Sequence, residues 1–157
     1  MSAQLDQIDR TILRSLQDEG RITNVDLARR AGLTAPPCLR RVRALEDEGV
    51  IRSYHARLDG AALGYGITVF AMVSLRSQAE NDLQAFERHV AGLPQVRECH
   101  MLNGEIDFIL KIVAPDLNAF QRILTTHLTP APNVASVKTS LTIRTAKAEA
   151  GIPVDPD

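Results

Sequence analysis

The sequence is poor in cysteine and contains no long run of apolar residues. Cys38 and Cys99 are its only cysteines, too few for a disulfide framework and too far apart in sequence for a metal knuckle or a redox pair. The longest apolar stretch, ITVFAMVSL, is far shorter than a membrane span, and the first residues, MSAQLDQIDR, do not resemble an export leader. We therefore expect a protein of the reducing cytoplasm that has no membrane partner.

Motifs of common enzymes are also missing. The sequence contains no glycine-rich phosphate loop, no HExxH and no nucleophile elbow. Glu98, Cys99 and His100 are residue types found in metal and nucleophile sites, but on a strand Cys99 would face away from its two neighbours. We therefore expect no catalytic site, no metal site and no cofactor, and we interpret His100 as a structural or subunit-contact residue.

Positive charge is concentrated near the amino terminus, although the whole chain has a formal charge of -1. Residues 21–57 contain eight arginines and four acids, a net charge of +4. Residues 61–157 contain eight basic and ten acidic groups, a net charge of -2. The two parts of the chain are therefore expected to have different partners.

Apolar spacing predicts three short helices before residue 50. The first ends near Gly20 and is indicated by the helical spacing of Leu5, Ile8, Ile12, Leu13 and Leu16. Thr23 and Asp26 resemble a weak capping box, so a second helix is expected from there to Gly32. A third helix is expected to begin within TAPPCLRRVRAL and to end near Gly49. This pattern is typical of a helix-turn-helix, and the following VIRSYHARL is expected to form a wing or an extended linker.

An internal repeat organises the second part of the chain. The sequence DLQAFER at 82–88 returns as DLNAFQR at 116–122. Each copy lies between two predicted strands, at 67–75 and 96–103 for the first and at 107–114 and 134–144 for the second. Two such units form a split, ferredoxin-like βαββαβ sheet with both helices on one face, which makes the fold class α+β. The bare face needs a partner, most simply a second subunit.

The predicted third helix separates apolar from basic residues. On a helical wheel, Cys38, Val42 and Leu45 cluster on one side with Leu39 nearby, while three arginines gather on or beside the other. A helix in this position of a helix-turn-helix lies in the major groove of DNA, where arginine binds guanine or phosphate. The alternative is a solvated face on which the arginines pair with nearby acids at 46–48.

Prolines at the start of this helix cost little, because first-turn amides have no acceptor within the helix. If Thr34 is the N-cap, the amides that its hydroxyl would normally bind do not exist, and the hydroxyl is available to another partner. We predict base contact by Arg40 and phosphate contacts by Arg41, Arg43, Arg29, Arg30 and Arg52. The other predicted DNA contacts are Thr34, Pro36 and Pro37, whose rings could lie against thymine methyls or sugars.

Four segments in order along the chain resemble the Lrp/AsnC family of bacterial and archaeal transcription regulators. They are LDQIDRTILRSLQDEGRITNVDLARRAGL, PPCLRRVRALEDEGVIRSYHA, VRECHMLNGEIDFILKIVAPDLNAF and PNVASVKTSLTI. The resemblance implies a winged helix-turn-helix, an extended linker and a ferredoxin-like βαββαβ ligand domain of the RAM/ACT-like type. It also implies dimers built through the sheets, larger rings that often contain four dimers, and amino-acid effectors.

The segment NGEID at 103–107 is the candidate effector loop. Gly104 suits a tight turn with exposed amides, and Asp107 offers a carboxylate to an ammonium group, although a plain hairpin turn also explains the pattern. The effector loop of the family resembles Gly-Asp-x-Asp, which Gly104 and Asp107 match and Glu105 does not. By position in the family scheme, Met101 and Ser140 line the pocket. The candidate residues are therefore Gly104, Glu105, Ile106, Asp107, Met101 and Ser140.

We therefore expect a sequence-specific, DNA-binding transcriptional regulator that responds to an amino acid or a related small effector and acts in the cytoplasm, associated with the nucleoid. Its partners would be double-stranded DNA, the effector, and further copies forming a homodimer and then a tetramer or octamer. Our domain division is 1–50 for the winged helix-turn-helix, 51–64 for wing and linker, 65–147 for sensing and oligomerisation, and 148–157 for a tail. One alternative is a nucleoid-associated architectural protein with little sequence preference. Another is a sensing module that regulates a different protein.

Overall fold

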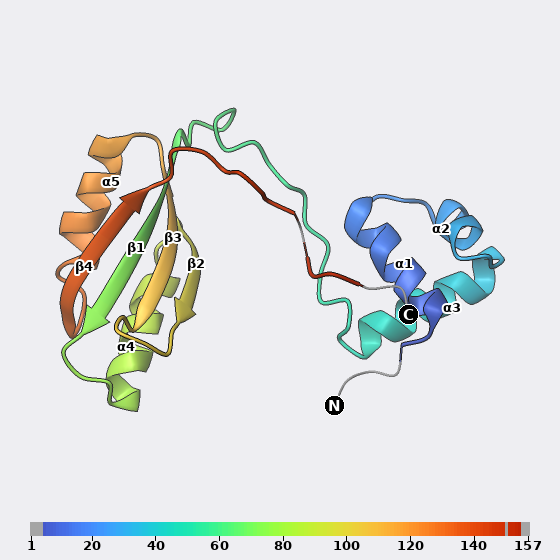
Figure 1. Cartoon of the computed structure of the whole chain (residues 1–157), viewed down its shortest axis with the longest axis horizontal. Coiled ribbons are helices and arrows are strands. Elements are labelled where there is room, and N and C mark those ends of the chain that lie inside the picture. Colours follow the sequence, from blue (N-terminus) through green and yellow to red (C-terminus); the bar gives the residue numbers. More distant parts are fainter. Residues whose placement is uncertain (1–4, 150, 155–157) are drawn as a thin grey trace. The chain divides into compact units, whose positions relative to one another are not determined.

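The computed structural model describes residues 5–149 and 151–154 and divides the chain into two compact units. The first unit comprises the described residues up to Leu58 and from Lys147 onwards, and the second is Asp59–Ala146. The first contains α1 (Gln7–Asp18), α2 (Asn24–Arg30) and α3 (Ala35–Asp47). The second contains β1 (Ile67–Leu75), α4 (Glu80–Ala91), β2 (Val96–Met101), β3 (Phe108–Ala114), α5 (Leu117–Ile123) and β4 (Val134–Leu141) (Figure 1). The predicted α+β class is confirmed.

The three helices of the first unit form where the apolar spacing predicts them. Their core is a small cluster of buried side chains, Ile12, Leu27, Ala28, Cys38 and Leu45. Asp6 caps α1 by accepting the N–H of Asp9, and Thr23 caps α2 by accepting the N–H of Asp26. Gly32 follows α2 with a φ of 69°, a conformation that favours glycine, and turns the chain into α3. The helix-turn-helix is thus fixed by its caps, one glycine and a shared core.

The segment after α3 is an extended linker. The structure describes every residue between α3 and β1, and none of them forms a strand. The first residues of this segment therefore do not form a β wing. Val50 and Ile51 pack against the helical core. Tyr54 donates its hydroxyl to Oε1 of Glu46 at 2.9 Å, and burial together with this carboxylate raises the pKa of Tyr54 to about 12. The start of the linker is therefore anchored to α3.

The second unit is a four-stranded antiparallel sheet with the order β2-β3-β1-β4. This is the strand order that the predicted βαββαβ arrangement requires, with β1 and β3 in the centre. Alternation along β1 places Val69, Ala71, Val73 and Leu75 in the core, as predicted. They pack with Leu83 and Phe86 of α4 and with Phe120 and Ile123 of α5, so both helices cover one face of the sheet (Figure 1).

No described residue packs over the opposite face of the sheet. Phe70 on β1 is 36% exposed, and its cross-strand neighbours are Lys111 and Ser140. On the same face Lys111 donates to Oε1 of Glu98 at 2.8 Å, and His100 lies 3.4 Å from the other carboxylate oxygen. An apolar centre with charged neighbours is suited to an interface with another protein surface.

After α5 the chain continues in one turn of π-helix, Leu124–Leu128. The sequence repeat does not predict this turn. In this wider turn the carbonyl of His127 accepts a hydrogen bond from Nε2 of His89, with 2.7 Å between the two atoms. The bond joins the end of this segment to α4. These two histidines are thus linked by a structural contact.

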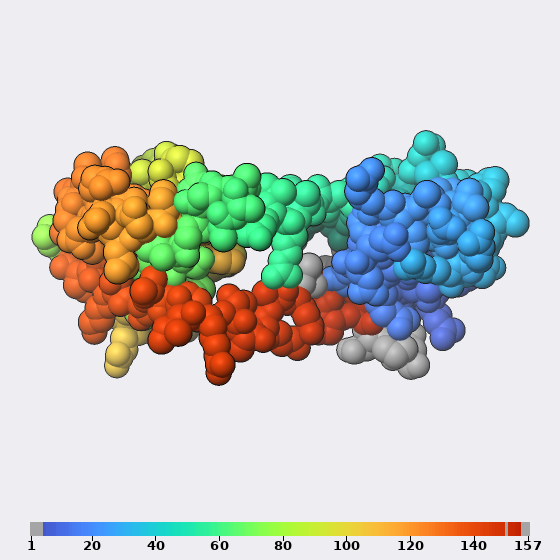
Figure 2. Space-filling model, turned by 90° about the horizontal axis from the view of Figure 1, so that it is seen from above, coloured from blue at the N-terminus to red at the C-terminus, as the bar shows by residue number. Residues whose placement is uncertain are grey.

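The carboxy-terminal segment belongs to the first unit, although the sequence left its role unassigned. The side-chain amide of Gln17 on α1 donates to the carbonyl of Ile152 at 3.0 Å and accepts the N–H of Ile152 at 2.9 Å. Gly151, with a φ of 73°, has no Cβ that would collide with this amide. Figure 2 shows the red carboxy-terminal segment reaching the blue atoms of the first unit.

No helix among the described residues is long and apolar enough to cross a membrane.

Candidate DNA-binding face and effector loop

The two faces of α3 differ as the helical wheel predicts. Cys38 and Leu45 are buried, although Leu39, expected near them, is 38% exposed. Arg40 and Arg43 are exposed on the other side, and neither guanidinium has a hydrogen bond or an ion pair with any described residue. The acids at 46–48 do not pair with these arginines. The solvated, acid-paired alternative therefore does not describe Arg40 and Arg43, which leave two guanidinium groups open to a ligand.

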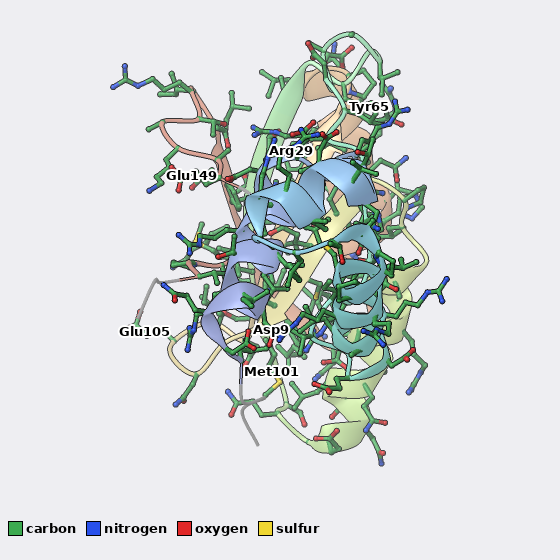
Figure 3. All side chains as sticks on the ribbon, turned by 90° about the vertical axis from the view of Figure 1, so that its right-hand side faces the viewer. Asp9, Arg29, Tyr65, Met101, Glu105 and Glu149 are labelled. Carbon is green, nitrogen blue, oxygen red and sulfur yellow. The ribbon has the colours of Figure 1, made fainter. Side chains whose placement is uncertain are left out.

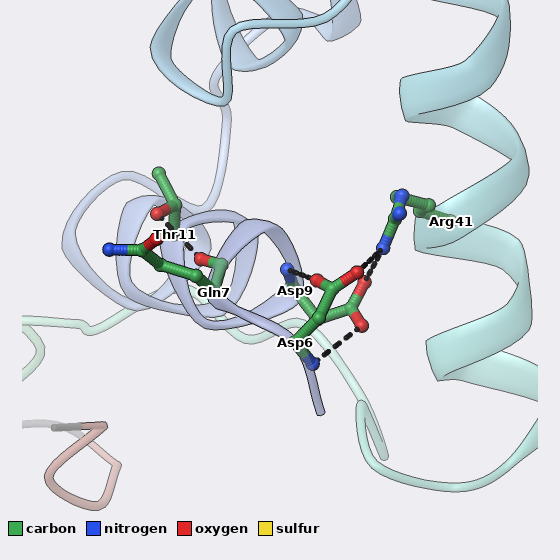
Figure 4. Close-up of polar contacts among 5 residues, drawn as sticks. All are labelled: Asp6, Gln7, Asp9, Thr11 and Arg41. Atoms are coloured by element: carbon green, nitrogen blue, oxygen red, sulfur yellow. Dashed lines mark hydrogen bonds and ion pairs between the residues drawn. The ribbon is translucent and has the colours of Figure 1, made fainter. Parts of the chain in front are cut away.

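Arg41 has a different environment from its two neighbours. Its Nη1 lies 2.7 Å from Oδ2 of Asp6 and 2.8 Å from Oδ1 of Asp9, at the start of α1 (Figure 4). The N–H of Asp9 and the Arg41 guanidinium hold the pKa of Asp6 below its ordinary value. That Arg41 contacts phosphate stays a prediction, and such a contact would have to compete with these two carboxylates. Arg41 joins α3 to α1, and its charge is already balanced by two carboxylates.

The arginines of α2 are exposed and form surface ion pairs. Arg29, labelled in Figure 3, lies 2.9 Å from Asp26, and Arg30 lies 2.6 Å from Glu19. Exposed pairs of this kind contribute little to stability, so a phosphate can replace the carboxylate at small cost. Arg52 is exposed on the linker and has no partner in the described part of the chain. All three stay predicted phosphate contacts.

The start of α3 has the unusual cap that the prolines predict. Thr34 is the N-cap, its side chain makes no cap hydrogen bond, and proline occupies the first turn. Thr34 and Pro36 are exposed, and Pro37 is half-buried. The predicted availability of the Thr34 hydroxyl is confirmed, while its contact with DNA stays a prediction.

Acid should weaken the contact between α1 and α3. Because the pKa of Asp6 is lower in the folded state than its unfolded value of about 3.9, its stabilisation is complete above that value and is lost as the pH falls through the folded pKa. We expect Arg41→Ala to unfold at a lower temperature near neutral pH and to lose less stability on acidification than the wild type. Thermal unfolding followed by circular dichroism from about pH 6 to about pH 3 measures this difference. Arg43→Ala is the control, and an identical pH dependence in Arg41→Ala and wild type would contradict the role of the ion pair.

The candidate effector loop connects β2 to β3 and is anchored at Asp107. This residue is 8% exposed, and its Oδ2 accepts the N–H of Leu75 at 2.7 Å while its Oδ1 accepts from Nε2 of Gln78 at 2.8 Å. The main chain of Asp107 is also bonded, to the carbonyl of Val73 and the N–H of Leu102. The carboxylate is therefore held at the end of β1, beside the loop.

A cavity of about 410 Å³ lies against this loop. It is lined by Gln78, Leu83, Met101, Leu102, Asn103, Gly104 and Asp107. It combines apolar side chains with a carboxylate and a glycine backbone, which suits a small amphipathic molecule. The predicted residues Met101, Gly104 and Asp107 thus come together around one space.

The other predicted effector residues lie outside this cavity. Glu105 is exposed on the loop, where Figure 3 labels it together with Met101, and Ile106 is half-buried. Ser140 is on β4, opposite Phe70, at the far edge of the sheet from β2. A role for Ser140 at this cavity therefore requires another subunit.

Sequence reasoning missed Gln78 as a lining residue. The antiparallel pairing of β1 with β3 brings the end of one strand beside the start of the other, and Gln78 follows the end of β1. The predicted βαββαβ order therefore contained the signal that could have found it.

Among the described residues, no group of three or more histidine, cysteine or acidic side chains could hold a metal ion.

Both units match family models. Residues 5–52 match a model described as winged helix-turn-helix DNA-binding, and residues 68–152 match the Lrp/AsnC ligand binding domain. The order of the two matches is the order of the two units in the structure.

Relatives and solved structures agree with these matches over nearly the whole chain. The Leucine-responsive regulatory protein of Rhizobium meliloti is 54% identical over 92% of each chain, and the Bkd operon transcriptional regulator of Pseudomonas aeruginosa is 41% identical over 97% of this chain and 99% of its own. A transcriptional regulator of Neisseria meningitidis, solved as an L-Met complex, has a TM-score of 0.92 at 35% identity and covers 97% of this chain and 98% of its own. The chain belongs to the Lrp/AsnC family of transcriptional regulators, with a helix-turn-helix DNA-binding unit followed by the ligand-binding domain of that family.

Proposed function

We propose that dimers of this regulator bind paired DNA half-sites, with α3 of each subunit in a major groove and Arg40 contacting bases. The observation that carries this proposal is the exposed basic face of α3, on which Arg40 and Arg43 have no partner in the described part of the chain. Arg43, Arg29, Arg30 and Arg52 contact phosphates, and a twofold axis places the half-sites one or more helical turns apart. The uncovered sheet face supports the dimer, and dimers assemble into a tetramer or octamer.

The effector of this proposal is an α-amino acid with an apolar side chain. Leu83, Met101 and Leu102 supply apolar surface in the cavity, Asp107 supplies a carboxylate for the ammonium, and the backbone at Gly104 supplies N–H groups for the carboxylate. The leucine-responsive name of one relative and the L-Met complex of one structural neighbour support the same ligand class. The effector acts by its different affinity for two assembly states. The protein acts in the cytoplasm at the nucleoid, without catalysis.

One gel-shift experiment tests this function. A duplex selected by the protein from random sequences is challenged at fixed salt with an excess of unrelated duplex, with and without L-leucine or L-methionine. We expect the selected duplex to be retained and its affinity to change when the amino acid is added. Equal competition by both duplexes would indicate an architectural protein, because backbone contacts are nearly indifferent to sequence. If no DNA complex forms, the protein would instead be a sensing module that regulates a different protein.

A further inference from the structure

The loop between β1 and α4 is held from two sides, and one of its side chains reaches the effector loop. The backbone N–H of Arg76 donates to the carbonyl of Asn133, and the Asn133 amide donates to the carbonyl of Ser77, both at 2.8 Å. The next residue, Gln78, donates to Asp107 at 2.8 Å and lines the cavity. Gln78 is therefore a side chain on a fixed piece of backbone that contacts the acid of the proposed effector site.

The contact with Gln78 changes what the Asp107 carboxylate can do. The bond from the Leu75 N–H fixes one oxygen, but the carboxylate plane can still turn about that oxygen. The second bond, from Gln78 to the other oxygen, fixes the plane. A carboxylate has about four lone-pair sites, so two bonds leave acceptor capacity for an ammonium group. Gln78 is also uncharged, so it orients the carboxylate without neutralising it.

We propose that Gln78 is a positioning residue of the effector site, which holds the Asp107 carboxylate in the orientation that accepts the ammonium of a bound amino acid. This inference rests on the proposed function, because it takes the cavity beside the effector loop as the amino-acid site. Gln78 acts through Asp107, so its effect appears only with ligands that carry an ammonium. It thereby contributes to the preference for amino acids over carboxylic acids of the same shape.

The test compares two ligands and three variants of the full-length protein by calorimetry. The ligands are L-leucine and 4-methylpentanoate, which has the same carbon skeleton without the ammonium. Gln78→Leu removes the donor, and Gln78→Lys keeps a donor but adds a positive charge beside Asp107. Gln84→Leu is the matched control, because Gln84 is exposed on α4 and donates only to Glu80 in the described structure, at 2.7 Å.

We expect Gln78→Leu to weaken L-leucine binding about 5- to 20-fold and to leave 4-methylpentanoate binding unchanged. Gln78→Lys should weaken L-leucine at least as much, and Gln84→Leu should bind as the wild type does. Unchanged L-leucine binding by Gln78→Leu, or an equal loss for both ligands, would overturn the inference, since an equal loss indicates a merely structural role. Failure of the wild type to bind either L-leucine or L-methionine would instead overturn the proposed effector class, and the inference with it.

Discussion

Replacing Arg40 with alanine is expected to lower the affinity for the selected DNA site by about 1 to 3 kcal/mol, the value of a good arginine–guanine contact. The Arg40 side chain is exposed and makes no hydrogen bond or ion pair with any described residue, so its removal should leave folding and assembly unchanged. Gel-shift titration with the selected duplex and with a scrambled duplex of equal length measures the effect. The loss should fall mainly on the selected duplex.

Arg43→Ala is the matched control for this variant. Arg43 lies on the same exposed face of α3, but we assign it to phosphate. Its removal should weaken binding to both duplexes alike and reduce the slope of log affinity against log salt by about 1. If Arg40→Ala binds the selected duplex as tightly as the wild type, or loses equally on both duplexes, Arg40 does not read the base sequence.

Most of the fold follows from local sequence patterns. The alternation in ITVFAMVSL predicts β1 at its observed bounds, Ile67–Leu75. The strand is apolar on both sides because one side is buried under the helices and the other forms the apolar centre of the open face. The repeat at 82–88 and 116–122 lies within α4 and at α5, since the same apolar spacing is needed to cover the same sheet face. Caps at Thr23 and Thr34 were also predictable, because a cap depends on adjacent residues only.

Contacts between distant residues could not be predicted in this way. Arg41 and the acids at the start of α1 are more than thirty residues apart, and nothing local to α3 distinguishes Arg41 from Arg40 or Arg43. The helical wheel does not show that the side of α3 carrying Arg41 lies beside the start of α1 in the folded unit. The docking of Ile152 on Gln17 joins residues 135 positions apart and has no local pattern.

The proposed effector site also combines features that are visible in the local sequence with contacts between distant residues. The turn at Gly104 and the acid at Asp107 are visible in the sequence, but the partners of that acid come from another strand and loop. The sequence suggests one role for Asp107, but the structure gives it two. It fixes the end of β1, and it offers a carboxylate to the cavity.

Substitution of Asp107 should separate these two functions. Asp107→Ala removes the acceptor of the buried Leu75 N–H, so we expect the second unit to lose about 1 to 3 kcal/mol of stability. We also expect this variant to lose its response to amino acids. Asp107→Asn keeps an oxygen for Leu75, removes the charge and puts an NH2 donor where Oδ1 accepts from Gln78, whose amide can turn to present its own oxygen. It should therefore stay nearly as stable as the wild type and bind L-leucine about 10- to 100-fold more weakly, because a bond between two charged groups is lost.

The measurements are urea unfolding for stability and calorimetry for L-leucine binding, with the DNA affinity of each variant measured in the absence of effector. DNA affinity should be unchanged in Asp107→Asn, because this residue lies in the second unit and α3 in the first. Glu105→Gln is the control, since Glu105 is exposed and does not line the cavity. Equal uptake of L-leucine by Asp107→Asn and the wild type would show that the Asp107 carboxylate does not bind the ammonium and serves only to fix β1.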